Sequence, residues 1–512
     1  MEAEIKLALD AASVAKIKKS PVLRPNAETE PVDDDHVDRY FDTPGFDLWK
    51  HGFALRVRSS GERHVQTLKG GGSALAGLHR RTELEAGVAS ETPDLDLFAR
   101  QLKQAVPELA RAAAGLQLAP EPVFVNRTRR TSWMLALEDG ARVEVALDVG
   151  ELQRGDKSVP VRELELEIKE GDPARLFQLA QQVHEHTPVR IENVSKAERG
   201  YALAHEDKPQ AVKATPVTLK RKATLGEALG AIMLNCLQQM QANERLVATG
   251  DVEGLHQMRV GLRRLRAALA MVRDLIHLPE PLAADIEWLA GELGEARNWD
   301  VFIESVLPAL PLTETHKPAL ARVEVAAREE AQRHHAKVRS AVGSARYTGL
   351  MLGLGGWIAG KGWQQAGLPQ DGGLPPDPLA QQVRRAAPRL VQHASARVRK
   401  RARTFDLTQP ENLHKVRIAA KKERYAREFF AALGHGKHGA RRHDLLTGMQ
   451  DELGEINDAF VAQDLVGQLR ERVPQEEGLL GFIEGVLAMR ALDALPRARK
   501  HVRNRLRDKA RF

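Results

Sequence analysis

The feature that most constrains this chain is a strand pattern in which charged and aliphatic side chains alternate. In Glu163-Leu-Glu-Leu-Glu-Ile-Lys169, three carboxylates and a lysine alternate with two leucines and an isoleucine. Successive side chains of a β-strand point to opposite faces, so the charged residues share one face. The pattern starts at Glu2-Ala-Glu-Ile-Lys-Leu7 and returns at Ala54-Leu-Arg-Val-Arg58 and Arg81-Thr-Glu-Leu-Glu85. A single strand of this kind indicates an ordinary solvated face, but simple solvation does not explain the recurrence.

A sheet that curls with all these charged faces inward would enclose a lumen lined by cations and carboxylates. Such a lumen suits a polyphosphate chain, because Arg and Lys bind phosphate oxygens while carboxylates hold divalent metal ions that bridge those oxygens. Segments with helical spacing at Ala11–Lys19, Asp94–Ala114 and Pro173–His186 would cover the outward aliphatic face. We therefore predict an N-terminal antiparallel β tunnel with flanking helices.

At 512 residues the chain is too long for one ordinary core, and its charge is uneven. Residues 1–210 hold 29 Lys and Arg against 35 Asp and Glu, whereas the remainder holds 47 against 34. The basic part is expected to bind a polyanion: nucleic acid, an acidic membrane surface or a phosphate polymer. A lone cysteine excludes an intramolecular disulfide framework. Because there is also no signal-peptide pattern and no apolar run of the ~20 residues that a spanning helix needs, we expect a cytoplasmic protein without a membrane span.

The pattern changes beyond residue 204 to a helical periodicity rich in Ala, Leu, Arg and Glu. A polar stretch with two prolines separates the two parts, and a second break at Gly367–Pro378 divides the helical part. We therefore predict an α+β protein in which the antiparallel β tunnel is followed by an all-α, duplicated helical bundle. The predicted boundaries are a tunnel domain at 1–204, a linker at 205–218, and a helical domain at 219–512 with repeats near 219–366 and 379–512.

The two halves of the helical part repeat one another. His256-Gln-Met-Arg-Val-Gly-Leu-Arg-Arg-Leu-Arg266 corresponds to His414-Lys-Val-Arg-Ile-Ala-Ala-Lys-Lys-Glu-Arg424, 158 residues later, and Leu293–Asn298 corresponds to Leu453–Asp458. At about 100° per residue, positions three, seven and ten residues after each histidine lie on its side of the helix. The two predicted cationic stripes are His256, Arg259, Arg263 and Arg266, and His414, Arg417, Lys421 and Arg424.

A basic stripe is compatible with a solvated helix face, but its duplication with a histidine at the same place favours a binding surface for a repeating polyanion. One histidine per helix does not provide a metal site. Aromatic residues make up only 4% of the chain, so platforms for base stacking are scarce and nucleic acid is the less favoured ligand.

Seven short motifs occur in order along residues 1–204. They are Glu2-x-Glu4-x-Lys6, Tyr40-Phe-Asp-Thr-Pro44, Gly52-x-Ala-Leu-Arg-Val-Arg58, Gln66-Thr-Leu-Lys-Gly70, Arg81-x-Glu-x-Glu85, Glu165-x-Glu167 and Ser195-Lys-x-x-Arg-Gly-Tyr201. Together they resemble the CYTH family of triphosphate tunnel metalloenzymes. The resemblance implies an eight-stranded antiparallel tunnel that hydrolyses triphosphates with Mg²⁺ or Mn²⁺.

The same resemblance implies roles for individual residues, carried over position by position. For Asp148 three roles stay open: it could bind a metal ion, it could orient the attacking water, or it could form a structural salt bridge, which is about as well supported as a catalytic role. The implied metal ligands are Glu2, Glu4, Asp148, Glu165 and Glu167; the implied phosphate-binding residues are Lys6, Arg56, Arg58, Lys69, Arg81, Arg129, Lys196 and Arg199; and the residues implied in catalysis are Glu83, Glu85 and Lys196.

The duplicated His-x-x-Arg-x-x-x-Arg/Lys helices resemble the CHAD domain, a conserved-histidine α-helical module, over roughly residues 219–512. This resemblance implies binding of long-chain inorganic polyphosphate. We therefore expect an inorganic triphosphatase that acts on tripolyphosphate, binds polyphosphate through its helical domain and associates with polyphosphate granules. The alternatives are a non-catalytic polyphosphate-binding scaffold, an enzyme acting on thiamine triphosphate or nucleoside triphosphates (cyclases included), and a nucleic-acid-binding helical half.

Overall fold

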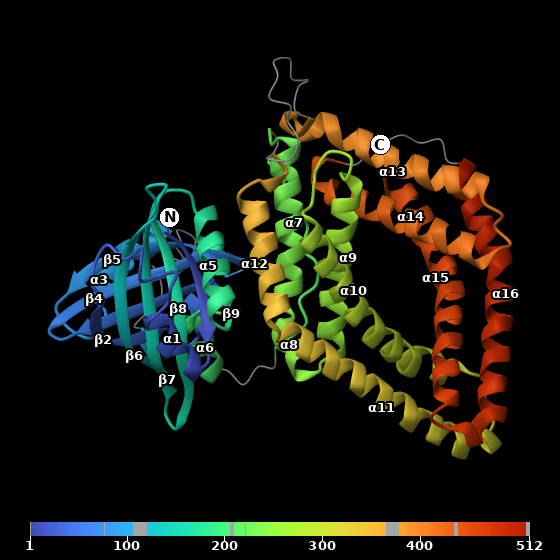
Figure 1. Ribbon diagram of the computed structural model, residues 1–512, viewed down its shortest axis with the longest axis horizontal. Coiled ribbons are helices and arrows are strands. Elements are labelled where there is room, and N and C mark those ends of the chain that lie inside the picture. The colour runs from blue at the N-terminus through green and yellow to red at the C-terminus, as the bar shows by residue number, and fades with distance from the viewer. Residues whose placement is uncertain are drawn as a thin grey trace. The chain divides into compact units, whose positions relative to one another are not determined.

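The computed structural model describes residues 2–75, 77–105, 120–204, 209–220, 222–364, 378–434 and 439–507 (Figure 1). The chain forms two compact units. The first comprises Met1–Pro209 and Gly343–Gly360, and the second comprises Gln210–Val342 and Lys361–Phe512. The first unit is built on strands and the second is helical, as the change of sequence pattern beyond residue 204 predicts.

Eight antiparallel strands form a closed ring in the first unit. Their order is β1-β5-β4-β3-β2-β6-β7-β8, and β8 pairs again with β1, which also pairs with the short strand β9 (Val189–Ile191). The predicted antiparallel tunnel is therefore confirmed. The ring consists of β1 (Glu2–Leu9), β2 (Val32–Asp42), β3 (Phe53–Ser60), β4 (Arg63–Leu75), β5 (Leu78–Val88), β6 (Glu121–Ala136), β7 (Arg142–Arg154) and β8 (Lys157–Glu170).

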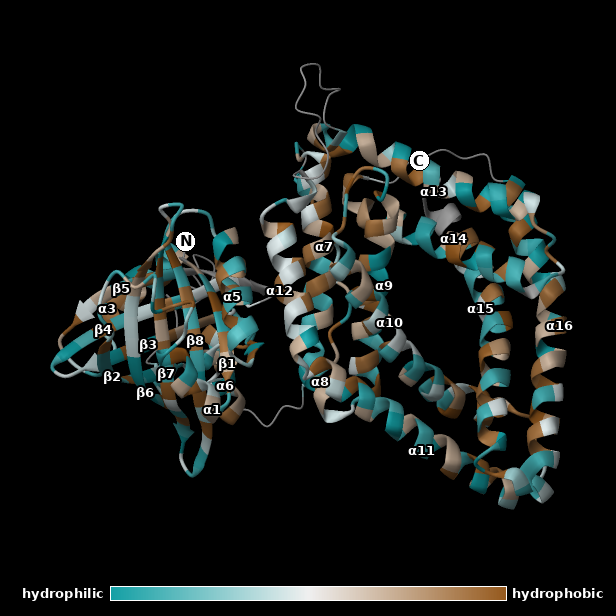
Figure 2. Ribbon diagram, viewed as in Figure 1, coloured by the Kyte–Doolittle hydropathy of each residue, from teal (hydrophilic) through white to brown (hydrophobic). Residues whose placement is uncertain are grey.

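Alternation decides which side chains face the lumen. In β1, Ile5 and Leu7 are fully buried in the outer core, whereas Glu4 and Lys6 line an interior cavity. The neighbouring strand β8 has the same arrangement, and its Glu165 stands opposite Lys6 in the register. Figure 2 shows hydrophilic and hydrophobic residues alternating along the strands. The charged faces of the strands therefore meet in the lumen, and the aliphatic faces are left for helices to cover.

Helices bury these aliphatic outer faces in separate clusters. One cluster joins β1, β6, β7 and β8 to α1 and α5 and includes Trp133; another joins β3 and β4 to α3 through Phe98. Tyr201 of α6 stacks on Trp49 of α2 with ring centroids 4.6 Å apart. These helices are α1 (Ala11–Lys18), α2 (Asp47–Lys50), α3 (Leu95–Ala105), α5 (Ala174–His186) and α6 (Lys196–Ala204).

Helix α12 (Ala345–Ala359) packs with the first unit, although the sequence places it in the first helical repeat. Its Leu352 is fully buried in the cluster that contains Phe177 of α5. A Cβ on Gly356 would lie 3.0 Å from the Cβ of Phe177, a tight contact that glycine avoids. The predicted boundary near residue 204 therefore describes the order of the chain but not the composition of the cores.

The second unit consists of helices in two similar sets. Helices α9 and α14 begin and end 158 residues apart, and α7 and α13 begin at the same offset, which confirms the predicted duplication. No helix within the described ranges is both long enough and apolar enough to cross a membrane. The main helices are α7 (Leu225–Ala242), α8 (Glu244–Thr249), α9 (Val252–Met271), α10 (Glu280–Val301), α11 (Lys317–Val342), α13 (Val383–Thr404), α14 (Pro410–Phe429), α15 (Gly439–Arg470) and α16 (Glu477–Arg507).

A buried ion pair joins α16 to α14 and supports a stability prediction. Arg505 Nη2 donates to Glu423 Oε2 at 2.7 Å and to Ser395 Oγ at 2.7 Å, and both charged residues are fully buried. We expect Arg505→Met to destabilise the helical unit by about 3–5 kcal/mol, because it leaves a buried carboxylate with one cation fewer. Chemical unfolding of the full chain, followed by circular dichroism at the helical band, measures this.

The double variant Arg505→Met/Glu423→Met is the matched control. It removes both charges, so we expect it to be more stable than Arg505→Met alone. A double variant that is as unstable as the sum of the two single variants would show that the charges do not interact.

Candidate functional site

The lumen of the strand ring contains a cavity of about 570 Å³ whose walls carry charges of both signs. Cations that can bind phosphate oxygens and carboxylates that can bind a hard metal ion therefore face the same space. The charged residues that line it are Glu4, Lys6, Arg56, Arg58, Lys69, Glu83, Glu85, Arg130, Glu144, Glu165, Glu167, Lys169 and Lys196.

Asp38 of β2 is fully buried and holds the two arginines of β3. Arg58 donates to its two carboxylate oxygens, from Nε at 2.6 Å and from Nη2 at 3.1 Å, and Arg56 lies 3.8 Å away. Burial raises the pKa of Asp38, but the Arg58 and Arg56 guanidiniums outweigh it and hold the pKa well below its usual value. Asp38 therefore stays ionised and fixes both arginines at the cavity wall.

Lys196, at the start of α6, lies among three carboxylates. Its Nζ is 2.8 Å from Asp148, 2.6 Å from Glu163 and 2.8 Å from Glu165. Arg130 also contacts Glu165, at 2.6 Å. Burial opposes both charges, yet the partners raise the pKa of Lys196 well above its ordinary value and hold the pKa of Glu165 well below its own. Both groups are therefore charged at neutral pH.

The carboxylates of this cavity have the donor chemistry for a divalent ion. Lys6 Nζ lies 3.0 Å from Glu4 and also contacts Glu165, so a positive charge lies between two carboxylates. In the part of the chain that the structure describes, which leaves out the Glu2 side chain, no three acidic, histidine or cysteine side chains are grouped to hold a metal. The carboxylate oxygens of Glu4 and Glu165 are hard donors of the kind that could hold a divalent metal ion.

Most residues singled out in the tunnel domain line this one cavity. Asp148 does not, because Arg130 binds it through two hydrogen bonds of 2.7 Å; its salt bridges match the structural alternative. Arg199 contacts Glu163 and is absent from the lining. The side chains of Glu2 and Arg81 lie outside the described residues. The predicted residues found in the lining are Glu4, Lys6, Arg56, Arg58, Lys69, Glu83, Glu85, Glu165, Glu167 and Lys196.

The predicted place of Arg129 in the tunnel is corrected by the structure. Its side chain is 63% exposed and pairs with Asp33 at 2.8 Å, whereas Arg130 lines the cavity. In the register Arg130 stands opposite Asp148, an inward-facing position of β7. The Arg127-Thr-Arg129 alternation resembles that of the inward-facing pairs on other strands, so the sequence did not show which face it occupies.

Asp38, Glu144 and Lys169 are further charged residues of the site that sequence reasoning did not select. Lys169 pairs at 2.7 Å with both Glu144 and Glu167 at the cavity wall. The signal for Lys169 was present, because it ends the Glu163–Lys169 alternation. For Asp38 there was no such signal, because its partners Arg56 and Arg58 lie on another strand.

In the helical unit, five of the predicted stripe residues and one further arginine form a group that we call the cationic cluster. Its members are His256, Arg259, Arg263, Arg297, Arg417 and Lys421. Burial and the neighbouring arginines lower the pKa of Arg259 to about 10 and the pKa of Lys421 to about 7. Cations held together in this way repel one another, and a bound polyanion would remove that repulsion.

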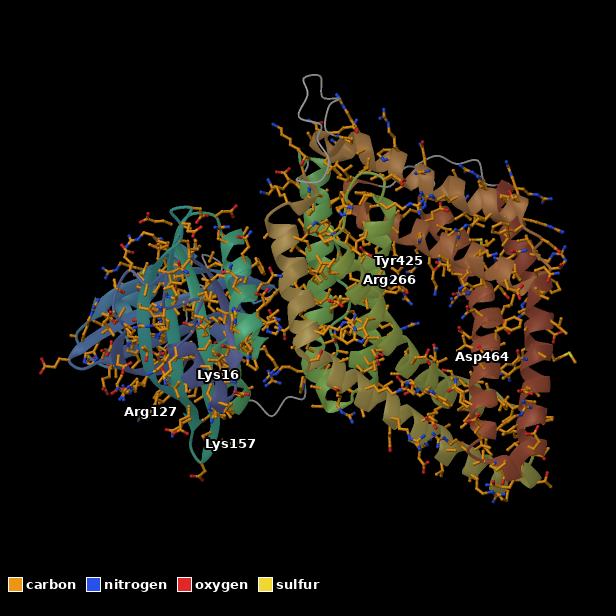
Figure 3. All side chains as sticks on the ribbon, in the orientation of Figure 1. Lys16, Arg127, Lys157, Arg266, Tyr425 and Asp464 are labelled. Carbon is orange, nitrogen blue, oxygen red and sulfur yellow. The ribbon has the colours of Figure 1, made fainter. Side chains whose placement is uncertain are left out.

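The other stripe residues have different partners. Arg266, which is labelled in Figure 3, is an exposed residue. Its side chain pairs with Glu287 at 2.6 Å. Arg424 lies over the ring of Tyr425, 4.6 Å from its centroid. The structure therefore does not bring the C-terminal arginine of either stripe into the cationic cluster.

His414 and Arg297 mark a difference between the two repeats. His414 Nδ1 lies 2.6 Å from Asn457 Oδ1 of α15. The equivalent position in α10 is Arg297. Burial is the main cause of the lowered pKa of His256, and the charge of Arg297 lowers this pKa further. The matching stretches Leu293–Asn298 and Leu453–Asp458 already pointed to this position, but the arginine was not selected as a binding residue.

With this geometry described, comparison with known proteins gives a clear assignment. Residues 1–201 match the sequence profile of the CYTH domain, and residues 231–467 match that of the CHAD domain. The chain carries a CYTH domain followed by a CHAD domain. CYTH tunnel metalloenzymes use divalent metal ions, which agrees with the carboxylates of the cavity.

Two relatives extend this assignment. A Haemophilus influenzae protein named inorganic triphosphatase is 31% identical over 165 residues, which are 32% of this chain and 44% of that protein. The chain thus covers less than half the length of this relative. The crystal structure of the CHAD domain from the plant Ricinus communis is 34% identical with a TM-score of 0.51, and the match covers 57% of this chain and 96% of that structure. The helical unit therefore has the CHAD fold.

Proposed function

We propose that the CYTH domain hydrolyses inorganic tripolyphosphate to pyrophosphate and phosphate with Mg²⁺ or Mn²⁺. The observation that carries this proposal is the single cavity in which fixed cations and ionised carboxylates face one another. A site that only binds anions gains nothing from buried carboxylates, which repel the ligand, so their presence supports metal-assisted catalysis over a passive scaffold. The name of the Haemophilus influenzae relative points in the same direction.

In this mechanism Arg56, Arg58 and Lys69 bind the phosphate oxygens and hold the chain in line. Arg56 Nε is buried without a hydrogen-bond partner, so a phosphate oxygen would satisfy it. Glu4 and Glu165, with Glu2 and Glu167, would hold the metal ion, which supplies charge neutralisation at the transferring phosphoryl group. The remaining role, orientation of the attacking water and acceptance of its proton, falls to the lining carboxylates Glu83 and Glu85, while Lys196 neutralises the charge that develops on the leaving pyrophosphate.

The aromatic residues of the unit favour an inorganic substrate over a nucleotide. Trp133 is buried in the outer core, Trp49 stacks on Tyr201, and Tyr40 stacks on Phe124 with centroids 4.4 Å apart. Of these rings only Tyr40 lines the cavity, and it is 5% exposed and already stacked on Phe124, so little of it is left for a base. We expect kcat/KM for tripolyphosphate to exceed that for ATP and for thiamine triphosphate by at least about tenfold. A factor of ten corresponds to about 1.4 kcal/mol, roughly the cost of one unfavourable contact with the organic group. A higher kcat/KM for ATP or thiamine triphosphate would overturn the substrate assignment.

We further propose that the CHAD domain binds long-chain polyphosphate through the cationic cluster. Support comes from the charge balance around Lys421, on which three arginines act against one acid, Asp458. Nucleic acid is the rival ligand. In competition at fixed salt, polyphosphate is expected to displace DNA, whereas displacement of polyphosphate by DNA at equal phosphate concentration would favour the rival.

The affinity for long-chain polyphosphate should fall as the pH rises from 7 to 9. Burial and the nearby Arg417, Arg263 and Arg259 lower the pKa of Lys421 to about 7, and a bound polyanion raises it again. Below this pKa the lysine is protonated in both states, and binding is strongest. Above it binding must take up a proton, so the affinity falls by at most about tenfold per pH unit. Titration calorimetry across this pH range measures the change.

Lys421→Arg is the matched control, because arginine keeps its charge over the whole range. We expect this variant to lose most of the pH dependence. His256 is neutral above pH 7 in the free protein, because burial lowers its pKa below the ordinary 6.5; a proton that it takes up on binding would appear as the pH dependence that remains in Lys421→Arg. The same slope in wild type and Lys421→Arg would show that another group titrates.

A further inference from the structure

The two repeats of the helical unit can be compared residue by residue. Helices α9 and α14 begin and end 158 residues apart, and α7 and α13, the helices packed against them, begin at the same offset (Figure 1). Within these four helices, residues separated by 158 therefore occupy equivalent positions. Each repeat shows what the other would contain if the two were identical.

In the first repeat, one of these positions holds a complete ion-pair cluster around Arg264. The arginine side chain is 1% exposed and donates to Glu428 at 2.8 Å, to Gln239 at 3.1 Å and to Asn235 at 2.9 Å. The ring of Phe429 lies below its guanidinium, 5.6 Å from the centroid. The charge of this arginine is therefore neutralised, and its hydrogen bonds are satisfied, inside the protein.

In the second repeat, the equivalent place is a pocket of about 120 Å³. Lys422 takes the position of Arg264 and Ala270 takes that of Glu428, so no carboxylate faces the lysine from this position; unlike the buried Arg264, Lys422 is exposed. None of the described residues that line this pocket is acidic. The site around Arg264 thus contains a carboxylate, which Glu428 of α14 supplies, where the equivalent site around Lys422 contains a pocket.

The neutral partners of the first repeat are also replaced by cationic or titratable groups. His393 stands where the first repeat has Asn235, and Arg397 stands where it has Gln239. Arg273 and Arg401 line the same pocket. The pKa of Lys422 is lowered, first by partial burial and then by the positive charges of the nearby Arg401, Arg397, Arg273 and Arg266.

The acid that partly compensates these cations is Asp274, which is 67% exposed. It lies 3.3 Å from Arg273 and 3.7 Å from Arg397, and so it does not take the place that Glu428 has in the first repeat. Arg273 is equally exposed, so this surface pair contributes little to the balance of charge, which rests on Lys422, Arg397 and Arg401. The pocket therefore keeps an excess of positive charge.

We propose that this pocket is a separate binding site for a small, multiply charged phosphate oxyanion, with pyrophosphate as the ligand. One carboxylate balances Arg264 in its buried site, whereas Lys422, Arg397 and Arg401 together face one pocket here and favour an anion of higher charge. The small volume excludes a nucleotide, because sites for ligands of that size span about 300–1,000 Å³. The site shares no residue with the cationic cluster, and it does not depend on the proposed hydrolysis, although that reaction would supply the ligand.

Ala270→Glu tests the proposal by restoring the missing carboxylate. In the full chain we expect pyrophosphate to slow hydrogen–deuterium exchange in the segment Leu390–Arg401 of α13. Ala270→Glu should abolish this protection, because its own carboxylate neutralises Lys422. Ala336→Glu, the same change at an exposed position of α11, should leave the protection intact. Lys422→Gln, which keeps the size of the side chain, should raise the half-saturating pyrophosphate concentration about tenfold.

Three anions are compared at equal ionic strength. Protection by pyrophosphate but not by sulfate supports the proposal, and additional protection by long-chain polyphosphate shows that the end of a chain also enters the pocket. Protection that persists in Ala270→Glu and in Lys422→Gln would overturn the assignment, as would equal protection by sulfate or an absence of protection in the wild type. None of these outcomes depends on whether the CYTH domain hydrolyses tripolyphosphate.

Discussion

Glu4→Gln is expected to lower kcat for tripolyphosphate hydrolysis about a thousandfold while leaving the fold intact. A metal ion contributes several kcal/mol of charge stabilisation, and each 1.36 kcal/mol corresponds to about a tenfold change in rate. Glu4 has lysine partners, Lys6 at 3.0 Å and Lys69 at 3.8 Å, and both retain other carboxylate contacts after the substitution. Phosphate release at saturating metal, together with the melting temperature of the variant, measures both expectations.

Glu165→Gln should lose activity to a similar degree but also lower the melting temperature. Its carboxylate contacts Lys6, Lys196 and Arg130, so an amide in its place leaves buried cations without their partner. Glu62→Gln, at an exposed turn, is the matched control and should behave as the wild type. Wild-type turnover by Glu4→Gln and Glu165→Gln would contradict the assignment of these residues to the metal.

The second large effect is expected in the CHAD domain. Replacing Arg259, Arg263 and Arg417 together by glutamine should weaken binding of long-chain polyphosphate at least about a hundredfold at low salt. Each lost phosphate contact also removes one released counterion, so the dependence of log K on log salt should become shallower by about two to three units. Calorimetry in EDTA, which removes divalent metal from the CYTH site, measures the affinity, and tripolyphosphate hydrolysis in a parallel assay should stay unchanged.

An equal loss of charge elsewhere provides the control for this variant. Arg328, Arg333 and Arg503 are exposed on other helices of the same unit, and their replacement by glutamine changes the net charge by the same amount. If binding depends only on net charge, the two triple variants will lose the same affinity. The proposed cluster requires that the control retain most of it.

The tunnel fold could be predicted because strand alternation is a strong constraint. In β1 and β8 the charged and aliphatic residues occupy opposite faces, and the structure places Glu4, Lys6 and Glu165 in one lumen as expected. The same alternation did not reveal which alternate residues of β6 face the lumen, where the inward-facing arginine is Arg130 and not Arg129. The face that each residue occupies depends on how β6 pairs with β2 and β7, and the residues of β6 alone do not determine that pairing.

Other features depend on contacts between distant segments. Asp38 belongs to the site because Arg58 and Arg56 of the next strand contact it, and α12 packs with the first unit where its Gly356 lies close to Phe177. The missing carboxylate at Lys422 is recognised only when the helices of the two repeats are aligned. The sequence offset of 158 residues was the usable signal, since it also aligns Ala270 with Glu428.

The most direct test of the central claim is phosphate release from tripolyphosphate by the full chain in the presence of Mg²⁺, Mn²⁺ or EDTA. The proposed function predicts rapid release with at least one of the two metals and none with EDTA. Release that continues unchanged in EDTA would contradict the role given to the carboxylates of the cavity. No release with either metal would contradict the hydrolase itself and leave the protein as a polyphosphate-binding scaffold.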